Sequence, residues 1–171
     1  ITRSVVLEAA VAGSVVLNAQ ASSSSPRRVL LIDPGSSGVV QLIRLSITGG
    51  HAEGVIGWNG GGVHVASGTL TLASCSIYGN TAYSWGGGVN VEGGSTVTLS
   101  SCQIYSNNAA GNGAGTRGGG IYVSGSTVSL ISSQINSNTA TNGPNLYINN
   151  VAGTAVCSTT TITGVFGPSP A

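Results

Sequence analysis

A stretch of residues that occurs three times limits the fold of this chain more than any other feature. Gly62, Gly88 and Gly120 occupy equivalent positions, 26 (88 − 62) and 32 (120 − 88) residues apart, and the longer interval contains AGNGAGTR (110–117), a loop by composition. The copies read GGGVHVASGTLTLASCSIYGNTA (60–82), GGGVNVEGGSTVTLSSCQIYSNNA (86–109) and GGGIYVSGSTVSLISSQINSNTA (118–140). A further copy precedes them at 28–50, and a degenerate one follows at 145–148. Repeats of this period indicate stacked units: each unit buries its apolar side chains against its neighbours, because one unit cannot bury them alone.

Each copy contains three short segments in which apolar and polar residues alternate. In the second copy these segments are Val89–Val91, Thr96–Leu99 and Cys102–Tyr105. Alternation with β-branched residues and Gly/Asn/Ser breaks predicts strands. A coil that returns to its starting place after three strands lets each strand stack on its copy, about 4.8 Å away. We therefore predict an all-β fold: a right-handed, single-stranded parallel β-helix with three parallel sheets and about five coils.

Like residues recur at the inward and corner positions of this β-helix. The inward positions form three predicted ladders: Val63, Val89 and Ile121; Leu72, Leu99 and Leu130; Ile77, Ile104 and Ile135. At one corner Asn predicts a hydrogen-bonded ladder and tolerates a left-handed backbone, and at another the glycine triplets avoid collisions between side chains. The Asn ladder consists of Asn80, Asn107 and Asn138.

Cys75 and Cys102 share one inward position on adjacent coils. They form either a disulfide or two buried free thiols. We favour free thiols that add to the structural ladder, because in-register parallel neighbours suit disulfide geometry poorly.

The first twenty residues allow two interpretations. Residues 3–21 resemble a secretory signal that ends in A-x-A at Ala19–Ala21. Glu8 interrupts the apolar stretch, and Val5–Leu7 and Val15–Leu17 have the pattern of strands, so we favour a structured first coil. We assign residues 1–167 to the β-helix domain and 168–171 to the start of a Pro/Ser-rich linker or tail.

Composition excludes several classes of partner. Only 5% of the residues are charged and the net charge is +1, so the chain lacks the cationic patch that nucleic acid requires. No apolar run reaches the roughly 18 residues of a membrane span, which predicts no membrane insertion. No Cys or His spacing indicates a metal, and we expect no cofactor. A surface built from Ser, Thr, Asn and Gly favours an extracellular or cell-surface location.

Two motifs at fixed places in each repeat are similar to a known family. They resemble the repeats of polymorphic outer-membrane proteins, within the pectin-lyase-like β-helix superfamily, over roughly residues 28–150. The motifs are GGV (61–63), GGV (87–89) and GGI (119–121), followed by I-x-x-N at Ile77–Asn80, Ile104–Asn107 and Ile135–Asn138. The resemblance implies a β-helix that serves surface display and adhesion without a catalytic centre.

The chain offers little for enzymatic chemistry, and we expect no enzyme. Its four acidic residues are dispersed, whereas a glycosidase needs two carboxylates held roughly 5–9 Å apart. His64 and Glu92 lie on adjacent predicted coils, and His is a natural general base. Because Glu92 aligns with Ala66, the two are offset by two residues. We expect them to be at least about 7 Å apart, as solvated surface residues.

A carbohydrate-binding or carbohydrate-active protein that uses the first sheet is an alternative function. One row of the first sheet points outward, and aromatic and Arg side chains lie in the turns just ahead of that sheet. Such rings suit the apolar faces of sugars, so the surface predicts binding of a polysaccharide or glycan; alternatively, the rings cover the corner glycines. The row contains His64, Asn90, Tyr122 and Tyr147, and the turns contribute Trp58, Trp85 and Arg117.

The second sheet presents a Thr-x-Thr lattice, with spacings of about 7 Å along the strand and about 4.8 Å between coils. Similar threonine arrays form the ice-binding surface of β-helical antifreeze proteins, which gives a second alternative. The lattice consists of Thr69, Thr71, Thr96, Thr98, Thr127 and Ser129.

The ends of a β-helix expose unpaired strand edges, which invite pairing with another chain. Strand-like sequence already begins at Val5, so we expect an open N-terminal end: either more protein precedes Ile1, or a second copy stacks there. The sequence therefore favours a non-enzymatic extracellular structural or adhesive module that stacks on itself into fibres.

Overall fold

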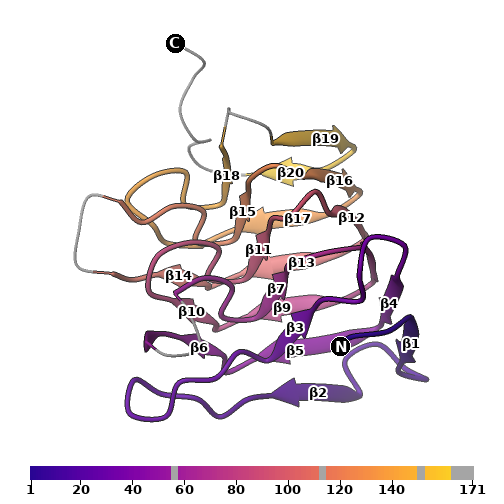
Figure 1. Cartoon of the computed structure of the whole chain (residues 1–171), viewed down its shortest axis with the longest axis horizontal. Coiled ribbons are helices and arrows are strands. Elements are labelled where there is room, and N and C mark those ends of the chain that lie inside the picture. The colour runs from indigo at the N-terminus through magenta and orange to yellow at the C-terminus, as the bar shows by residue number, and fades with distance from the viewer. Residues whose placement is uncertain (55–57, 112–114, 150–152, 163–171) are drawn as a thin grey trace.

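Parallel pairing between successive turns of the chain organises the whole structure. The computed structural model describes residues 1–54, 58–111, 115–149 and 153–162. It is an all-β solenoid of about five turns, as predicted. Each strand inside a sheet pairs in parallel with its counterparts one turn earlier and one turn later, and each edge strand pairs with one of them, so the strands lie in columns along the solenoid axis (Figure 1).

The three predicted columns are present. The first sheet contains, in spatial order, β18 (Leu146–Ile148), β15 (Ile121–Val123), β11 (Val89–Val91), β7 (Val63–Val65) and β3 (Leu30–Ile32). The second sheet contains β1 (Val5–Glu8), β4 (Val39–Ile43), β8 (Thr69–Ala73), β12 (Thr96–Ser100), β16 (Thr127–Ile131) and β19 (Thr154–Ser158). The third sheet contains β2 (Val15–Asn18), β5 (Leu45–Thr48), β9 (Ser76–Tyr78), β13 (Gln103–Tyr105), β17 (Gln134–Asn136) and β20 (Thr161–Ile162).

A fourth column was not predicted. It follows the asparagine corner and contains β6 (His51–Ala52), β10 (Thr81–Ala82) and β14 (Asn108–Ala109). Two residues are too few to show a periodic pattern, so the sequence carries no signal for it.

The N-terminal segment forms the first coil. β1 pairs with β4 and β2 pairs with β5, as expected for strands in this segment. The predicted Pro/Ser tail, 168–171, lies outside the described residues.

The predicted apolar ladders fill the interior. Val63, Val89 and Ile121 pair in register, and the leucine and isoleucine ladders of the other two sheets do the same. All nine side chains are fully buried. Each coil therefore covers the apolar side chains of the coil before it, and this burial is the main stabilising contribution.

The asparagine ladder is present and extends by one residue. Asn107 Oδ1 accepts hydrogen bonds from the backbone N and Nδ2 of Asn80, and Asn138 Oδ1 does the same for Asn107. Asn145 ends the ladder by accepting the equivalent bonds from Asn138. The expected left-handed backbone falls one position earlier than predicted, on Gly79, Ser106 and Ser137.

The glycine corner requires glycine because backbone atoms approach it closely. A Cβ on Gly88 would lie 2.7 Å from the carbonyl oxygen of Gly120 and 3.0 Å from Asn107 Cγ. Gly62 and Gly120 have the same surroundings in their coils. In the last coil the position is Asn145, whose side chain completes the ladder.

The two predicted corner cysteines are buried free thiols. Cys75 Sγ donates to the carbonyl oxygen of Leu42, and Cys102 Sγ donates to that of Leu72. Ser133 occupies the same position in the next coil, and its Oγ donates to the Leu99 carbonyl oxygen. The two thiols and the hydroxyl therefore make the same hydrogen bond to the preceding coil. The pKa of Cys102 is raised, first by its hydrogen bond to Cys75 and then by burial.

Candidate functional site

The outward row of the first sheet lies in register as predicted. His64 pairs with Asn90, Asn90 with Tyr122, and Tyr122 with Tyr147. The expected exposure is wrong: Asn90 and Tyr122 are at most 1% exposed, and His64 and Tyr147 stay below 9%. The row is therefore an internal layer.

Side chains from the turns cover this row. Trp85 stacks on Tyr122 with ring centroids 5.0 Å apart, and Tyr122 stacks on Tyr147 at 5.6 Å. The Arg117 guanidinium lies 5.1 Å from the centroid of the Tyr147 ring, which is a cation–π contact. The aromatic side chains thus pack on one another, which matches the alternative role of covering the corner.

Trp58 differs from the other residues of the predicted sugar site. It is 48% exposed and meets the ring of Tyr83 edge-on, with centroids 4.4 Å apart. The structure does not bring its ring into the stack formed by Trp85, Tyr122 and Tyr147.

His64 and Glu92 are in contact, so the expected separation of at least about 7 Å is wrong. His64 Nε2 lies 3.1 Å from Glu92 Oε1. Asn90 Nδ2 lies 3.2 Å from His64 Nδ1 and 3.2 Å from Glu92 Oε2. Glu92 lies just beyond the end of β11, where its long side chain reaches back across the two-residue offset.

The charges of this cluster stabilise one another. The pKa of Glu92 is lowered, first by the hydrogen bond from His64 and also by Asn90 and the positive charge of Arg28, against an opposing effect of burial. Burial lowers the pKa of Arg28, and Glu92 opposes that shift. Since Nδ1 accepts from the Asn90 amide, Nε2 carries the hydrogen that His64 donates to Glu92. Both ring nitrogens are therefore engaged, and the cluster connects three coils.

The other acidic residues lie in separate contacts. Glu8 Oε1 is 2.6 Å from Arg44 Nη2, Glu53 Oε2 is 2.9 Å from His51 Nε2, and Asp33 accepts from Ser67. Within the described residues, no three His, Cys, Asp or Glu side chains gather in a way that could hold a metal ion.

The threonine lattice has the predicted register. Thr69, Thr96 and Thr127 pair in sequence, as do Thr71, Thr98 and Ser129. The first row continues to Thr154, which sequence reasoning missed. In the coil that precedes Thr69 and Thr71, Val39 and Gln41 occupy the paired positions, so the lattice ends there.

Sequence reasoning also missed an aromatic pair on the third sheet. Tyr78 and Tyr105 stack with ring centroids 5.2 Å apart and planes 6° from parallel. The signal was the Ile-Tyr dipeptide in two successive repeats, with Ile77 and Ile104 facing inward and the tyrosines outward.

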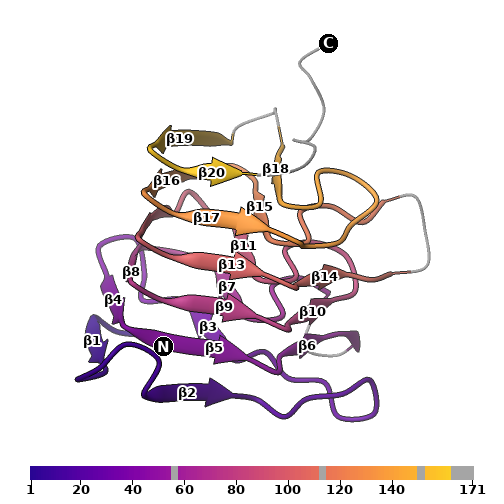
Figure 2. The ribbon, with the colours of Figure 1, turned by 180° about the vertical axis from the view of Figure 1, so that it is seen from behind.

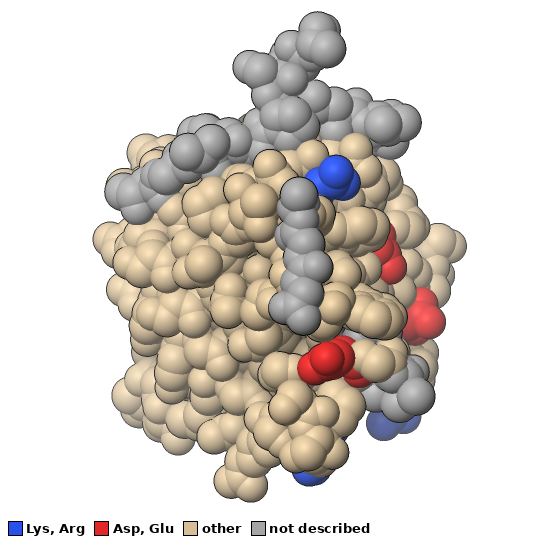
Figure 3. Space-filling view, turned by 90° about the vertical axis from the view of Figure 1, so that its left-hand side faces the viewer, with Lys and Arg blue, Asp and Glu red and all other residues tan. Residues whose placement is uncertain are grey.

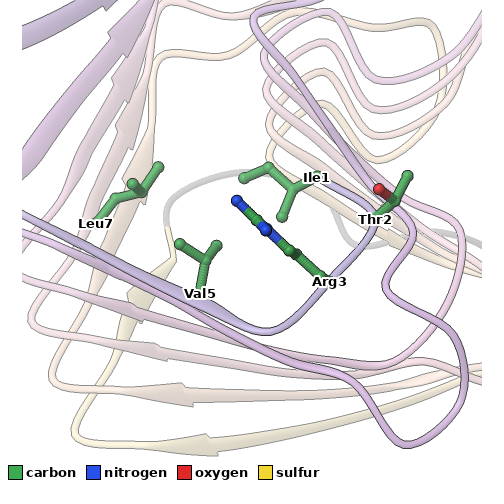
Figure 4. Close-up of a pocket in the computed structure, with 5 residues that line it drawn as sticks. All are labelled: Ile1, Thr2, Arg3, Val5 and Leu7. Carbon is green, nitrogen blue, oxygen red and sulfur yellow. The ribbon is translucent and has the colours of Figure 1, made fainter.

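The N-terminal end of the solenoid is hollowed. Ile1, Thr2, Arg3, Val5 and Leu7 line an open cavity of about 280 Å³ (Figure 4). The backbone nitrogen of Ile1 donates to the Leu31 carbonyl oxygen at 2.6 Å, which links this segment to β3.

Charged groups are sparse on the face shown in Figure 3, where most atoms belong to uncharged residues. Among the described residues, no helix has the length and apolar character needed to cross a membrane. Comparisons with protein-family models, curated proteins and solved structures found no match to this chain.

Proposed function

We propose that the protein is a non-enzymatic structural module of the extracellular or cell-surface kind, whose solenoids stack end to end. The supporting observation is the first coil. Its core-facing side chains Val5, Leu7 and Leu17 are only partly buried, and so is Leu30 of β3, the edge strand of the first sheet. The residues at the same positions in the third coil are fully buried. Leu70 and Leu72 correspond to Val5 and Leu7, Ile77 corresponds to Leu17, and Val63 pairs directly with Leu30.

The partner that fits this end is the last coil of a second copy. β18, β19 and β20 are the outermost strands of the same three sheets that β3, β1 and β2 begin. A second copy stacked there would continue the parallel pairing, and the small side chains Ala155 and Cys157 would lie over Val5 and Leu7. None of these six strands carries a charge except Glu8, which is paired with Arg44.

The edge of β1 has hydrogen-bonding groups available for such a partner. Ala9 N donates to the Ile43 carbonyl oxygen across the β1–β4 boundary. Alternate residues of a strand direct their N–H groups to opposite edges, so the N–H of Val6 points away from β4. This is the bare edge that native proteins protect or use for association.

We further propose that the chain is related to the polymorphic outer-membrane repeats, within the pectin-lyase-like superfamily. The GG-V/I and I-x-x-N motifs support this relation. Both motifs have structural roles here: the glycines at the crowded corner and the asparagines in the ladder. A module of this kind would supply length and surface for adhesion rather than turnover.

Sedimentation velocity and negative-stain microscopy at increasing protein concentration test the stacking. We expect concentration-dependent rods longer than one solenoid. Val6→Pro removes the outward N–H while keeping the bonds to β4, and it should return the protein to monomers; Val6→Ala keeps the N–H and should still stack. Wild-type monomers at every concentration would exclude stacking, and product release from neutral or acidic polysaccharides would exclude a non-enzymatic role.

Ice binding is a second candidate, favoured by the in-register row Thr69, Thr96, Thr127 and Thr154. Hydroxyl and methyl groups repeat there, on strands β8, β12, β16 and β19, which contain no charged residue. Measurable thermal hysteresis, lost in Thr98→Tyr, would support it, and zero hysteresis at high protein concentration would exclude it.

A further inference from the structure

Two thiols lie on adjacent coils in the interior, at the corner that joins the second sheet to the third. Cys75 lies between β8 and β9 (Figure 2), and Cys102 occupies the same position one coil later, between β12 and β13. Both residues are only 1% exposed. They are 27 residues apart (102 − 75), so no local sequence motif indicates that they come together.

The hydrogen bonds of the two thiols fix the distance between their sulfur atoms. Cys75 Sγ donates to the Leu42 carbonyl oxygen at 3.2 Å, and Cys102 Sγ donates to that of Leu72 at 3.4 Å. Each thiol also contacts the carbonyl oxygen two residues earlier in its own coil. Leu42 pairs with Leu72, so the two side chains have the same orientation in successive coils. Their sulfur atoms are therefore separated by about the spacing of the coils, roughly 4.8 Å.

This separation disfavours a disulfide and suits a bridging metal ion. A disulfide bond is about 2.05 Å long, so the sulfurs would have to approach by roughly 2.7 Å inside a packed interior. Both thiols are free. A thiolate sulfur lies about 2.3 Å from a bound d¹⁰ metal ion such as Zn²⁺, so two such bonds in line span about 4.6 Å. That span matches the spacing of the two sulfurs.

The surroundings allow two ligands and select the class of ion. By the register of the third sheet, Leu45 lies one coil before Cys75 and Ser133 lies one coil after Cys102. A leucine is no ligand, and a hydroxyl is a poor one for a soft ion. Zn²⁺ requires four ligands, and no third His, Cys, Asp or Glu joins the pair in the described part of the chain. Soft monovalent ions such as Cu(I) and Ag(I), in contrast, are stable with two thiolates in line.

The corner can accommodate the charge of such a complex. A monovalent ion between two thiolates leaves one net negative charge. Cys102 N donates to Ser133 Oγ, and the backbone amide of Cys75, in the equivalent position, is hydrogen-bonded to the Cys102 sulfur. Such a bond favours the charged form of the sulfur. Exposed Ser74 and Ser101 directly precede the cysteines, so the pair lies one residue below the surface, within reach of an entering ion.

We propose that Cys75 and Cys102 form a binding site for a soft monovalent metal ion of the Cu(I) class, held in line between the two thiolates. Binding forms two metal–sulfur bonds and breaks two S–H bonds; both protons pass to solvent, and no oxidation state changes. The bound ion links two adjacent coils. The site lies in the interior, away from the ends, so it goes beyond end-to-end stacking and does not depend on it.

Anaerobic titration of the reduced protein with Cu(I), and separately with Ag(I), tests the proposal. Native mass spectrometry should show one tightly held ion per chain. The midpoint of thermal unfolding should rise, because the ion binds the folded state and links two coils. X-ray absorption at the copper edge should show two sulfur neighbours and no nitrogen or oxygen neighbour. Zn²⁺ at the same concentration should not be retained, since two of its four ligands are missing.

Cys75→Ser and Cys102→Ser should each lose the ion. Both should fold, because Ser133 already makes the same hydrogen bond through a hydroxyl in the next coil. Cys157→Ser is the matched control: it removes the exposed third thiol and should bind like the wild type.

Three results would overturn the proposal: retention of the ion by either corner variant, its loss in Cys157→Ser, or no bound ion in wild type whose thiols are reduced. If a corner variant does not fold, the sulfur count from X-ray absorption of the wild type decides, and any count other than two contradicts the site.

Discussion

At the scale of single residues, the most demanding position is Asn107. Its side chain donates to the carbonyl oxygens of Ile77 and Tyr105 and to Asn138 Oδ1, and it accepts two bonds from Asn80. Asn107→Ala would leave buried backbone groups without partners. We expect it to lower the free energy of unfolding by about 3 kcal/mol, measured by urea denaturation.

Asn136→Ala is the matched control for that variant. Asn136 lies two residues before the next ladder asparagine but points outward and is only half-buried. Its loss should change the free energy of unfolding by less than about 0.5 kcal/mol. Equal effects of the two substitutions would contradict the importance of the ladder.

Glu92 gives a pH-dependent contribution whose sign follows from its lowered pKa. A carboxyl group with a folded-state pKa below the unfolded one stabilises the fold above the unfolded pKa, and this stabilisation is lost as pH falls through the folded pKa. Glu92→Gln should therefore be less stable than wild type at pH 7, by up to about 1 kcal/mol because the carboxyl is partly exposed. In urea denaturation the difference should shrink as the pH falls through the lowered folded-state pKa of Glu92; a constant difference would show that Glu92 acts without its charge.

At the scale of elements, the corners constrain the chain more than the strands do. Gly88→Ala would press a Cβ against the Gly120 carbonyl oxygen and the Asn107 side chain. We expect a loss of about 3 kcal/mol in the free energy of unfolding. Gly115→Ala, where a Cβ meets nothing within 4 Å and the backbone is not left-handed, should be neutral. If Gly88→Ala left the free energy of unfolding unchanged, the corner would be able to relax around the added Cβ.

The strands and inward ladders were predictable because alternation and copy-to-copy repetition each determine the inward face. The sheet of two-residue strands β6, β10 and β14 was not, since it shows no period. The candidate site was predicted less well. The register of His64, Asn90, Tyr122 and Tyr147 follows from the repeat, but their burial depends on how turn residues such as Trp85 fold back over them. Sequence spacing gives no measure of that, nor of how far the Glu92 side chain reaches.

At the scale of the whole molecule, each coil contacts chiefly its neighbours, so stability should be close to a sum over coils and interfaces. Removing one whole repeat should then preserve the fold. Deletion of residues 81–107, which are 27 residues (107 − 80), joins Asn80 to Asn108. Leu72 would then stack on Leu130 and Ile77 on Ile135, which keeps each interior ladder alike.

We expect the shortened protein to fold with a β-type circular dichroism spectrum and a single cooperative unfolding transition. Its free energy of unfolding should be lower than that of the wild type, because one coil and one interface are lost. Deleting residues 81–93, about half a repeat, is the control: it puts strands of different sheets in register and places polar residues inward, so it should not fold. Unfolding of the whole-repeat deletion, or a stable half-repeat deletion, would contradict the description of the molecule as a stack of interchangeable coils.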